Sequence, residues 1–400
     1  MHVNIPKKRH SPAPVLEAGF RLFFLSAAIY AVVNVVLWIL LYSYAVAVPV
    51  QHVPVMYWHA HEMLFGYALA VITGFLLTAV SNWTGLPMLS GRPLLLMWFL
   101  WLIPRVVFFI PGISWFYLGL LCEALFISAL IYNVLTPIVK VKQWRQIGVI
   151  SKLFLLAFAN LAYYYGVLYW LQDGGRLGLA LGLYFVLGLI FTFARRVFPP
   201  FIENGVGYNV KLKNWKIIDR LSLALFFAFA ISDAVARNNP SVLYLSGGLF
   251  LVHCIRLYGW YTHGIWPRPL LWILYVGYAA LTSGFLLKAL SVSGLVPYYI
   301  PLHAFAYGGV GLITLGMMSR VALGHTGRNV FMPPPAIQLI FLSITIGFLA
   351  RILLPIVDAS HYELWIAVSG GLWILSFLIF LVIYAPMLLT QRVDAVGRKQ

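Results

Sequence analysis

The segment Trp58–Gly66, which reads WHAHEMLFG, places two histidines and a glutamate at the start of an otherwise apolar stretch. Ionisable side chains are costly in the hydrocarbon core of a membrane, so groups of this kind indicate a functional site by default. Imidazole is a common ligand of haem iron and of copper. A second apolar stretch of similar pattern begins at His303. These residues predict a redox-metal centre that involves His59, His61 and His303.

The composition indicates a membrane protein. Hydrophobic residues make up 62% of the 400 residues and charged residues only 9%, whereas a soluble domain carries about 25% charged residues. Apolar runs of about 20 residues, the length needed to cross a bilayer, recur along the chain. They lie at 20–43, 57–80, 94–111, 114–137, 149–171, 176–197, 217–236, 241–262, 270–290, 300–321, 333–355 and 362–388. We therefore predict an all-α polytopic membrane bundle of about twelve helices, residues 19–388, between tails at 1–18 and 389–400.

The net charge of +17 is explained by topology rather than by nucleic-acid binding. If the N-terminus is cytoplasmic, most basic residues fall on the cytoplasmic side, as the positive-inside rule requires. These residues are Lys7, Lys8, Arg9, Lys140, Lys142, Arg145, Arg195, Arg196, Lys211, Lys213, Lys216, Arg268, Arg328, Arg392, Arg398 and Lys399. The opposite loops carry only Arg176, Arg237 and Lys288. The distribution predicts that both tails are cytoplasmic and that the chain has no nucleic-acid partner.

Depth in the membrane separates the histidines into groups. His59, His61 and His303 start their helices on the outer side. His325 follows His303 by 22 residues, which is about 33 Å of continuous helix, so these two cannot bind one metal. His325 either binds a second metal on the cytoplasmic side or caps the last carbonyl oxygens of its helix. His253, near the middle of its helix, is the stronger candidate for a second ligand, because an unpaired polar group there is costly.

His59 and His61 are two residues apart, and residues with this spacing point about 200° apart around a helix. On a regular helix they face different neighbours, and chelation of one ion by both is disfavoured. One histidine can then serve a haem while the other faces a second centre. The alternative is that the three outer histidines only cap their helices and bond to backbone carbonyl oxygens.

Glu62 must be paired or protonated to be tolerated inside the bundle. Arg105 and Arg351 are candidate partners, because both lie in the outer halves of their helices against the charge rule. An arginine fork binds carboxylates bidentately, and these include haem propionates as well as glutamate. Both arginines are therefore candidates for cofactor binding or for a structural pair. The chain has no CxxCH attachment motif, so any haem is of the b type, held non-covalently.

The helices that begin near His61 and His303 resemble each other. Counted from these two histidines without gaps, identical or similar residues coincide at five positions. The pairs are Phe65 with Tyr307, Gly66 with Gly308, Gly74 with Gly316, Thr84 with Thr326 and Gly85 with Gly327. The pattern predicts an internal repeat that relates the second helix to the tenth, with chance similarity among glycine-rich helices as the alternative. Glycines at such positions let a neighbouring backbone or a flat macrocycle approach closely.

Several segments, in order and over nearly the whole chain, resemble the NnrS family. They are GFRLFF (19–24), WHAHEMLFG (58–66), GFLLTAV (74–80), NWTG (82–85), RRV (195–197), HCIRL (253–257) and RVALGHTGR (320–328). The resemblance implies a multi-pass protein of the bacterial inner membrane that contains haem and copper and is linked to denitrification and protection against nitric oxide. More distantly, haem histidines on helices two and ten resemble the catalytic subunit of haem–copper oxidases, although the sixth helix has no histidine and the seventh has no His-His pair.

The residues and the resemblance together predict a haem b and copper protein that binds nitric oxide and reduces or detoxifies it, with electrons from an unidentified donor. His61 and His303 would ligate the haem, and His59 would face a second centre. Glu62 would carry protons at the outer side. One alternative is a haem-bearing sensor or metal-delivery factor without turnover. Another is a secondary transporter, which many membrane helices with an internal repeat would also suit.

The charge distribution makes a prediction about topology that a reporter fusion tests. An enzyme reporter that is active only in the cytoplasm, fused after Gln400, should be active, and one that is active only outside it should be silent. Activity of the external reporter alone would contradict the topology and also the outer position of His59, His61 and His303.

Overall fold

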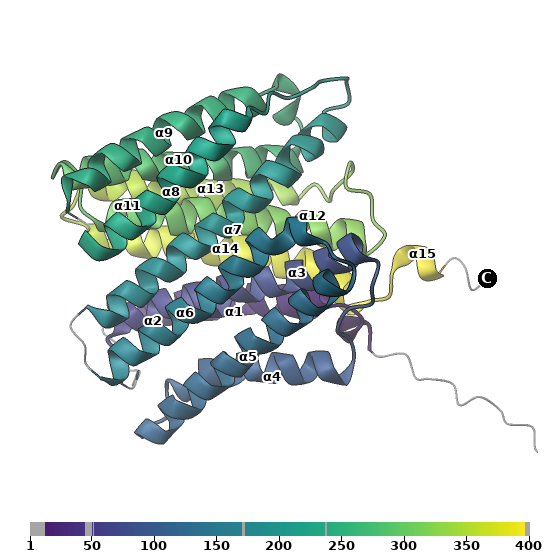
Figure 1. Ribbon diagram of the computed structural model, residues 1–400, viewed down its shortest axis with the longest axis horizontal. Helices are drawn as coiled ribbons and strands as arrows, with labels where there is room; N and C mark the ends of the chain where they lie inside the picture. The colour runs from purple at the N-terminus through teal and green to yellow at the C-terminus, as the bar shows by residue number, and fades with distance from the viewer. Residues whose placement is uncertain (1–12, 45–49, 51, 170–172, 237, 397–400) are drawn as a thin grey trace, which may run out of the picture.

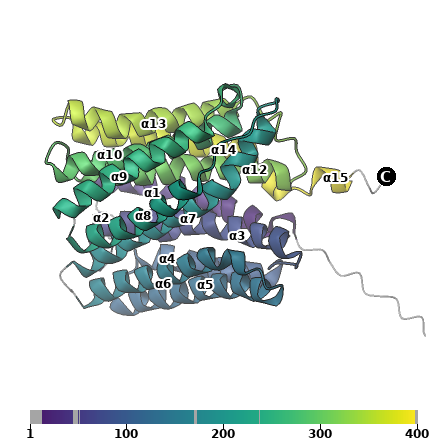
Figure 2. The same cartoon turned by 45° about the horizontal axis from the view of Figure 1, so that its top comes forward.

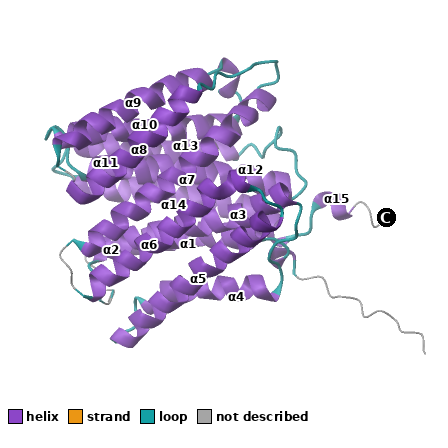
Figure 3. Cartoon of the chain, in the orientation of Figure 1, coloured by secondary structure: helices purple, strands orange, loops and turns teal. Residues whose placement is uncertain are grey.

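The computed structural model of the chain describes residues 13–44, 50, 52–169, 173–236 and 238–396. The regular structure of these residues is helical throughout, which confirms the all-α prediction (Figure 3). Ten of the described helices are long and apolar enough to cross a membrane. They are α1 (Gly19–Tyr42), the α2–η2–α3 helix (Val55–Thr84), α5 (Ile113–Lys140), α6 with its preceding turn (Trp144–Leu168), α7 (Gly174–Gly205), α9 (Pro240–Trp260), α10 (Pro269–Val292), the α11–η5–α12 helix (Tyr299–His325), α13 (Ile337–Val357) and α14 (Tyr362–Leu389).

Two further helices coincide with the remaining predicted segments. α4 (Arg92–Val107) has 16 residues, and α8 (Lys216–Ala236) has 21 but carries several charged residues. The count of twelve spans therefore stays a prediction. The basic residues Lys7, Lys8, Arg9, Arg237, Arg398 and Lys399, which contributed to the topology prediction, lie outside the described residues. A short helix, α15 (Val393–Val396), follows α14.

The long helices run side by side, and the bundle is built from layers (Figures 1 and 2). α4 and α5 form one edge, and α8, α9 and α10 lie toward the other. α1 packs against α14, so the first and last long helices are neighbours. The Arg21 guanidinium joins them, because its Nη1 donates to the carbonyl oxygens of Leu388 at 3.0 Å and Thr390 at 2.5 Å. The start of α1 and the end of α14 thus lie on the same side of the bundle, as the predicted topology requires.

Local sequence explains where helices begin and end. α9 begins at Pro240, whose fixed backbone suits the first helical position, and the preceding Asn239 side chain accepts a hydrogen bond from the Ser241 amide. α3 (Leu69–Thr84) ends at Gly85, whose φ of +69° is the left-handed conformation that glycine adopts without strain. Both signals can be recognised in the sequence, and in the structure α9 begins at the first and α3 ends at the second.

Two helices widen into π-helical turns at matching places. α2 (Val55–His61) continues as η2 (Glu62–Ala68) before α3, and α11 (Tyr299–His303) continues as η5 (Ala304–Leu312) before α12 (Ile313–His325). Each π-helical segment starts at the residue after one of the two histidines that the repeat aligns. Such segments are rare and often lie at functional sites. The repeat itself stays a prediction, and this correspondence supports it.

Sequence analysis did not predict the close approach of α6 (Ile147–Leu168) to α7. A Cβ atom added at Gly178 would lie 2.4 Å from the backbone nitrogen of Tyr163. A Cβ atom at Gly166 would lie 2.3 Å from the Gly174 carbonyl carbon. Only glycine permits these contacts, because backbone cannot move aside as a flexible side chain can. Small residues at helix contacts are the usual means of tight packing in membranes.

This packing predicts opposite effects for two glycine substitutions. Gly178→Ala should lower the thermal stability of the purified protein, because the new methyl group forces α6 and α7 apart. Gly247→Ala in α9, where a Cβ atom would meet nothing within 4 Å, should leave stability unchanged or raise it, because alanine favours the helix by about 1 kcal/mol. Equal melting temperatures for the two variants in the same detergent would contradict the α6–α7 contact.

Candidate functional site

Five buried side chains form an ionic cluster at the start of η2, and we call it the carboxylate cluster: His61, Glu62, Arg105, Glu123 and Tyr164. The Arg105 Nε lies 2.7 Å from a Glu62 carboxylate oxygen, and its Nη2 pairs with Glu123. The Tyr164 hydroxyl donates to the second Glu123 oxygen at 2.8 Å. The predicted partner of Glu62 is thus confirmed as Arg105.

Both ring nitrogens of His61 face this cluster. Its Nδ1 lies 2.9 Å from a Glu62 oxygen, and its Nε2 lies 3.4 Å from a Glu123 oxygen and 3.2 Å from the Asn160 amide nitrogen. The ring stacks on Tyr163 at 4.3 Å and is fully buried. An amide N–H can only donate, so the Nε2 of His61 accepts from Asn160 and its Nδ1 donates to Glu62. Both ring nitrogens of His61 therefore have polar partners within the cluster and its surroundings.

His59 points away from this cluster, as the two-residue spacing predicted. Its Nδ1 lies 3.0 Å from the Asn34 side-chain oxygen on α1, and its ring stacks on Trp38 at 4.3 Å. An oxygen acceptor at Nδ1 holds the proton on that nitrogen, so the Nε2 lone pair is available. His59 is only partly buried.

In His303, as in His59, the proton of the neutral ring lies on Nδ1. Its Nδ1 lies 2.8 Å from the backbone carbonyl oxygen of Tyr299, which can only accept, so Nδ1 carries the proton. Its Nε2 lone pair accepts a hydrogen bond from the Arg351 Nη2 at 3.0 Å. Metal-binding histidines commonly donate their second ring N–H to an oxygen in this way. His59 and His303 both meet that condition.

Arg351 contacts His303 and an aromatic ring. Its Nη2 donates to the His303 Nε2, and its guanidinium lies 5.4 Å from the centre of the Tyr362 ring. Its Nη1 is buried without a hydrogen-bond partner among the described residues. We call His59, His303 and Arg351 the outer histidine site, because the sequence predicts that both histidines start their helices on the outer side. The structure places His61 among the carboxylates and leaves His59 and His303 outside that cluster.

His253 is fully buried, and its Nδ1 lies 2.7 Å from the Tyr278 hydroxyl, to which Arg256 donates at 3.0 Å. Its Nε2 has no hydrogen-bond partner in the part of the chain that the structure describes. The ring stacks on Phe191 at 4.5 Å. His253 as a metal ligand stays a prediction.

His325 lies at the end of α12, where its ring packs against Phe20 at 5.6 Å. The capping hypothesis is wrong: among the described contacts the imidazole makes no hydrogen bond, and the Thr326 hydroxyl bonds to the carbonyl oxygens of Ala322 and Leu323 instead. A search of the described residues finds no group of three or more His, Cys, Asp or Glu side chains that could hold a metal ion. A second metal at His325 stays a prediction.

Sequence reasoning missed Glu123 and Tyr164 of the carboxylate cluster. It also missed Asn160 and Tyr30, which bond to His61 and Glu62. Glu123 had a readable signal, since it is the one acidic residue in the apolar run 114–137. Tyr30 on α1 donates to Glu62 and had no such signal, because tyrosines are frequent in this chain. Only the packing of α1 against η2 reveals its role.

A known protein family matches most of the chain. A family model described as NnrS protein matches residues 14–392, which include every residue of the carboxylate cluster and of the outer histidine site. No curated protein matches the chain.

We expect the charges of the carboxylate cluster to contribute to the stability of the protein together, so that the effect of removing one depends on the others. Arg105→Met should destabilise the protein by about 3–5 kcal/mol, because it leaves two carboxylates buried without their cation. Adding Glu62→Gln and Glu123→Gln to that variant should restore part of the loss, since the triple variant buries no unpaired carboxylate. Thermal unfolding in detergent measures both effects. A triple variant less stable than Arg105→Met alone would contradict charge balance as the organising principle.

Proposed function

Because this chain belongs to the NnrS family, we propose that it is a haem b protein of the bacterial inner membrane that binds nitric oxide and reduces or detoxifies it. Family membership links a membrane protein of this kind to the response to nitric oxide. The observation that carries the haem proposal is the outer histidine site, in which the Nδ1 atoms of His59 and His303 each face an oxygen acceptor and Arg351 lies beside His303.

The residues of the outer histidine site fit a haem. His59 and His303 would hold the iron through their Nε2 atoms, and each has its other ring nitrogen fixed by an oxygen acceptor. The Arg351 fork, with its buried Nη1 unpartnered, suits the carboxylate of a propionate. When bound, a haem supplies an iron that binds nitric oxide and exchanges electrons. This proposal replaces His61 with His59 as the partner of His303.

The carboxylate cluster suits proton handling beside that site. Reduction of nitric oxide consumes protons as well as electrons, and His61 has a carboxylate at each ring nitrogen, Glu62 at Nδ1 and Glu123 at Nε2. A ring placed between two carboxylates can accept a proton from one and release it to the other. Glu62 keeps the role of proton carrier that the sequence predicted, now shared with Glu123. Arg105 neutralises the pair rather than binding a cofactor.

Copper remains a proposal without an assigned set of ligands. Neither His253 nor His325 belongs to a group of three or more possible metal ligands among the described residues. The electron donor is also unassigned. A sensor would bind nitric oxide at the same haem without turnover. A sensor and an enzyme would therefore have the same haem spectra. Nitric oxide consumption by reduced protein in liposomes separates an enzyme from a sensor.

Four variants test the haem assignment through a reduced-minus-oxidised spectrum and metal analysis of purified protein. His59→Ala and His303→Ala should each lose the same low-spin haem signal. His61→Gln should keep it, because its ring belongs to the carboxylate cluster. His361→Ala, whose ring is exposed in the loop before α14, is the matched control and should not differ from the unaltered protein.

Two results would overturn this assignment. Loss of the signal in His61→Gln with retention in His59→Ala would restore the pairing of His61 with His303. A colourless unaltered protein, purified from cells that make haem, would reject the haem proposal and leave the transporter alternative, which ion flux in liposomes measures.

A further inference from the structure

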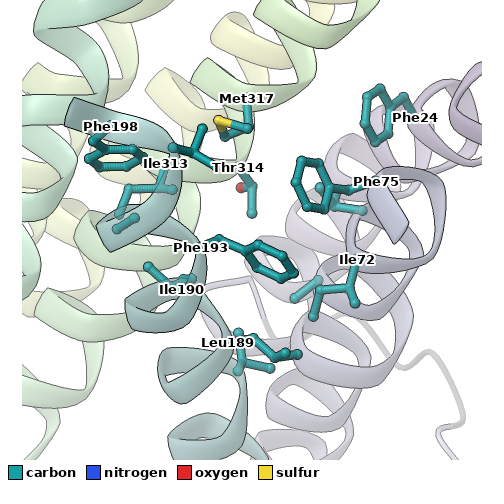
Figure 4. Close-up of a pocket in the computed structure, with 15 residues that line it drawn as sticks. Phe24, Ile72, Phe75, Leu189, Ile190, Phe193, Phe198, Ile313, Thr314 and Met317 are labelled. Carbon is teal, nitrogen blue, oxygen red and sulfur yellow. The ribbon is translucent and has the colours of Figure 1, made fainter. Parts of the chain in front are cut away.

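A cavity of about 70 Å³ lies where α3, α7 and α12 meet. Figure 4 shows its lining, with Phe75 from α3, Phe193 from α7 and Met317 from α12 pointing toward one another. Nothing in the proposed function uses this cavity. It lies deeper in the bundle than the outer histidine site, because its α12 wall starts at Ile313, ten residues after His303.

The lining cannot bind water or a polar ligand. Thr314 carries the single side-chain hydroxyl in the wall, and its oxygen already bonds to the Tyr67 hydroxyl at 2.7 Å and to the Val310 carbonyl oxygen at 2.7 Å. A buried water needs two to four polar partners, and cavities without them stay dry and take apolar guests such as xenon. The chemistry of this wall therefore selects an uncharged, apolar occupant.

The volume narrows the choice further. A water molecule takes about 30 Å³ of the liquid, whereas pockets for drug-sized molecules measure about 300–1,000 Å³. A space of 70 Å³ holds a diatomic molecule or a single noble-gas atom and is too small for a quinone ring.

Two aromatic side chains of the wall are accessible from outside the bundle. Phe75 and Phe193 are only partly buried and meet edge to face, with ring centres 4.9 Å apart. Their contact joins α3 to α7. On the inner wall, Ala68 and Ala194 are buried and leave the space open because their side chains are short. Small apolar gases dissolve in hydrocarbon, so they need no polar entrance.

We propose that this cavity is a binding site for a small uncharged gas molecule, deeper in the bundle than the outer histidine site. Gas binding by the cavity stands independently of the proposed function. The identity of the natural guest as nitric oxide rests on that function.

Xenon NMR of the full-length protein in lipid nanodiscs tests gas binding without any haem chemistry. The unaltered protein should show one saturable xenon site. Ala194→Leu should abolish it, because three added carbons fill the space, and Val71→Ala should strengthen it by enlarging the wall. Ala228→Leu, the same change at an exposed position of α8, is the control and should bind xenon as the unaltered protein does.

Three outcomes would overturn the proposal. One is the absence of a saturable xenon site in the unaltered protein. The second is full xenon binding by an Ala194→Leu variant that unfolds at the same temperature as the control. The third is an acyl chain or detergent tail that fills the cavity in an experimental map, because it would identify an apolar tail as the occupant.

A second readout addresses the natural guest. After photolysis of a nitric oxide complex, Ala194→Leu should rebind nitric oxide from solution more slowly than Ala228→Leu, with the equilibrium spectrum unchanged. If the two variants rebind nitric oxide at equal rates although Ala194→Leu no longer binds xenon, the cavity is a gas-binding site that does not deliver nitric oxide to the haem. If the protein forms no nitric oxide complex, the proposed function fails while the xenon result still decides the cavity.

Discussion

The burial of two carboxylates beside one guanidinium is the constraint on which this part of the bundle depends. Glu62 and Glu123 are both almost completely buried from bulk solvent. Arg105 lies between the two carboxylates, so η2, α4 and α5 must approach closely enough to share one guanidinium. In a low-dielectric interior an incomplete set of such charges is far more costly than a missing apolar contact. The positions of η2, α4 and α5 relative to one another follow from this requirement.

Hydrogen-bond partners, more than position along the helix, distinguish the histidines. His59, His61, His253 and His303 all lie in apolar helices, and residue type alone makes each a ligand candidate. The atom facing Nδ1 separates them: a carbonyl or amide oxygen leaves Nε2 available in His59 and His303. In His253 the neighbour of Nδ1 is the hydroxyl of Tyr278, which can donate or accept. His61 has polar partners at both ring nitrogens, with Glu62 at Nδ1 and with Asn160 and Glu123 at Nε2.

Sequence reasoning reached the membrane class, the positions of the long helices and two candidate partners of Glu62, because apolar length and isolated charges are properties of single segments; the structure selects Arg105 from the two. It also predicted correctly that His59 and His61 face different neighbours, since helical geometry fixes the angle between them. The pairing of His61 with His303 stays a prediction, because it relied on an alignment of two helices, which carries no information about what each ring touches. Tyr30, Asn160 and the α6–α7 contact at Gly178 depend on which helices become neighbours, which no local pattern records.

The two π-helical segments set the rotational phase of the helices that contain them. A π turn has about one residue more than an α turn, so each segment rotates the part of its helix that follows relative to the part that precedes it. Deleting one residue from η2 or η5 would turn the rest of that helix by about 100°. Ala68 and Ile313, at the ends of these segments, would then leave the cavity wall while His59 and His303 kept their places. The same local widening thus lets one helix present histidine to the outer site and an apolar face to the cavity, two orientations that a uniform α-helix of this sequence would not combine.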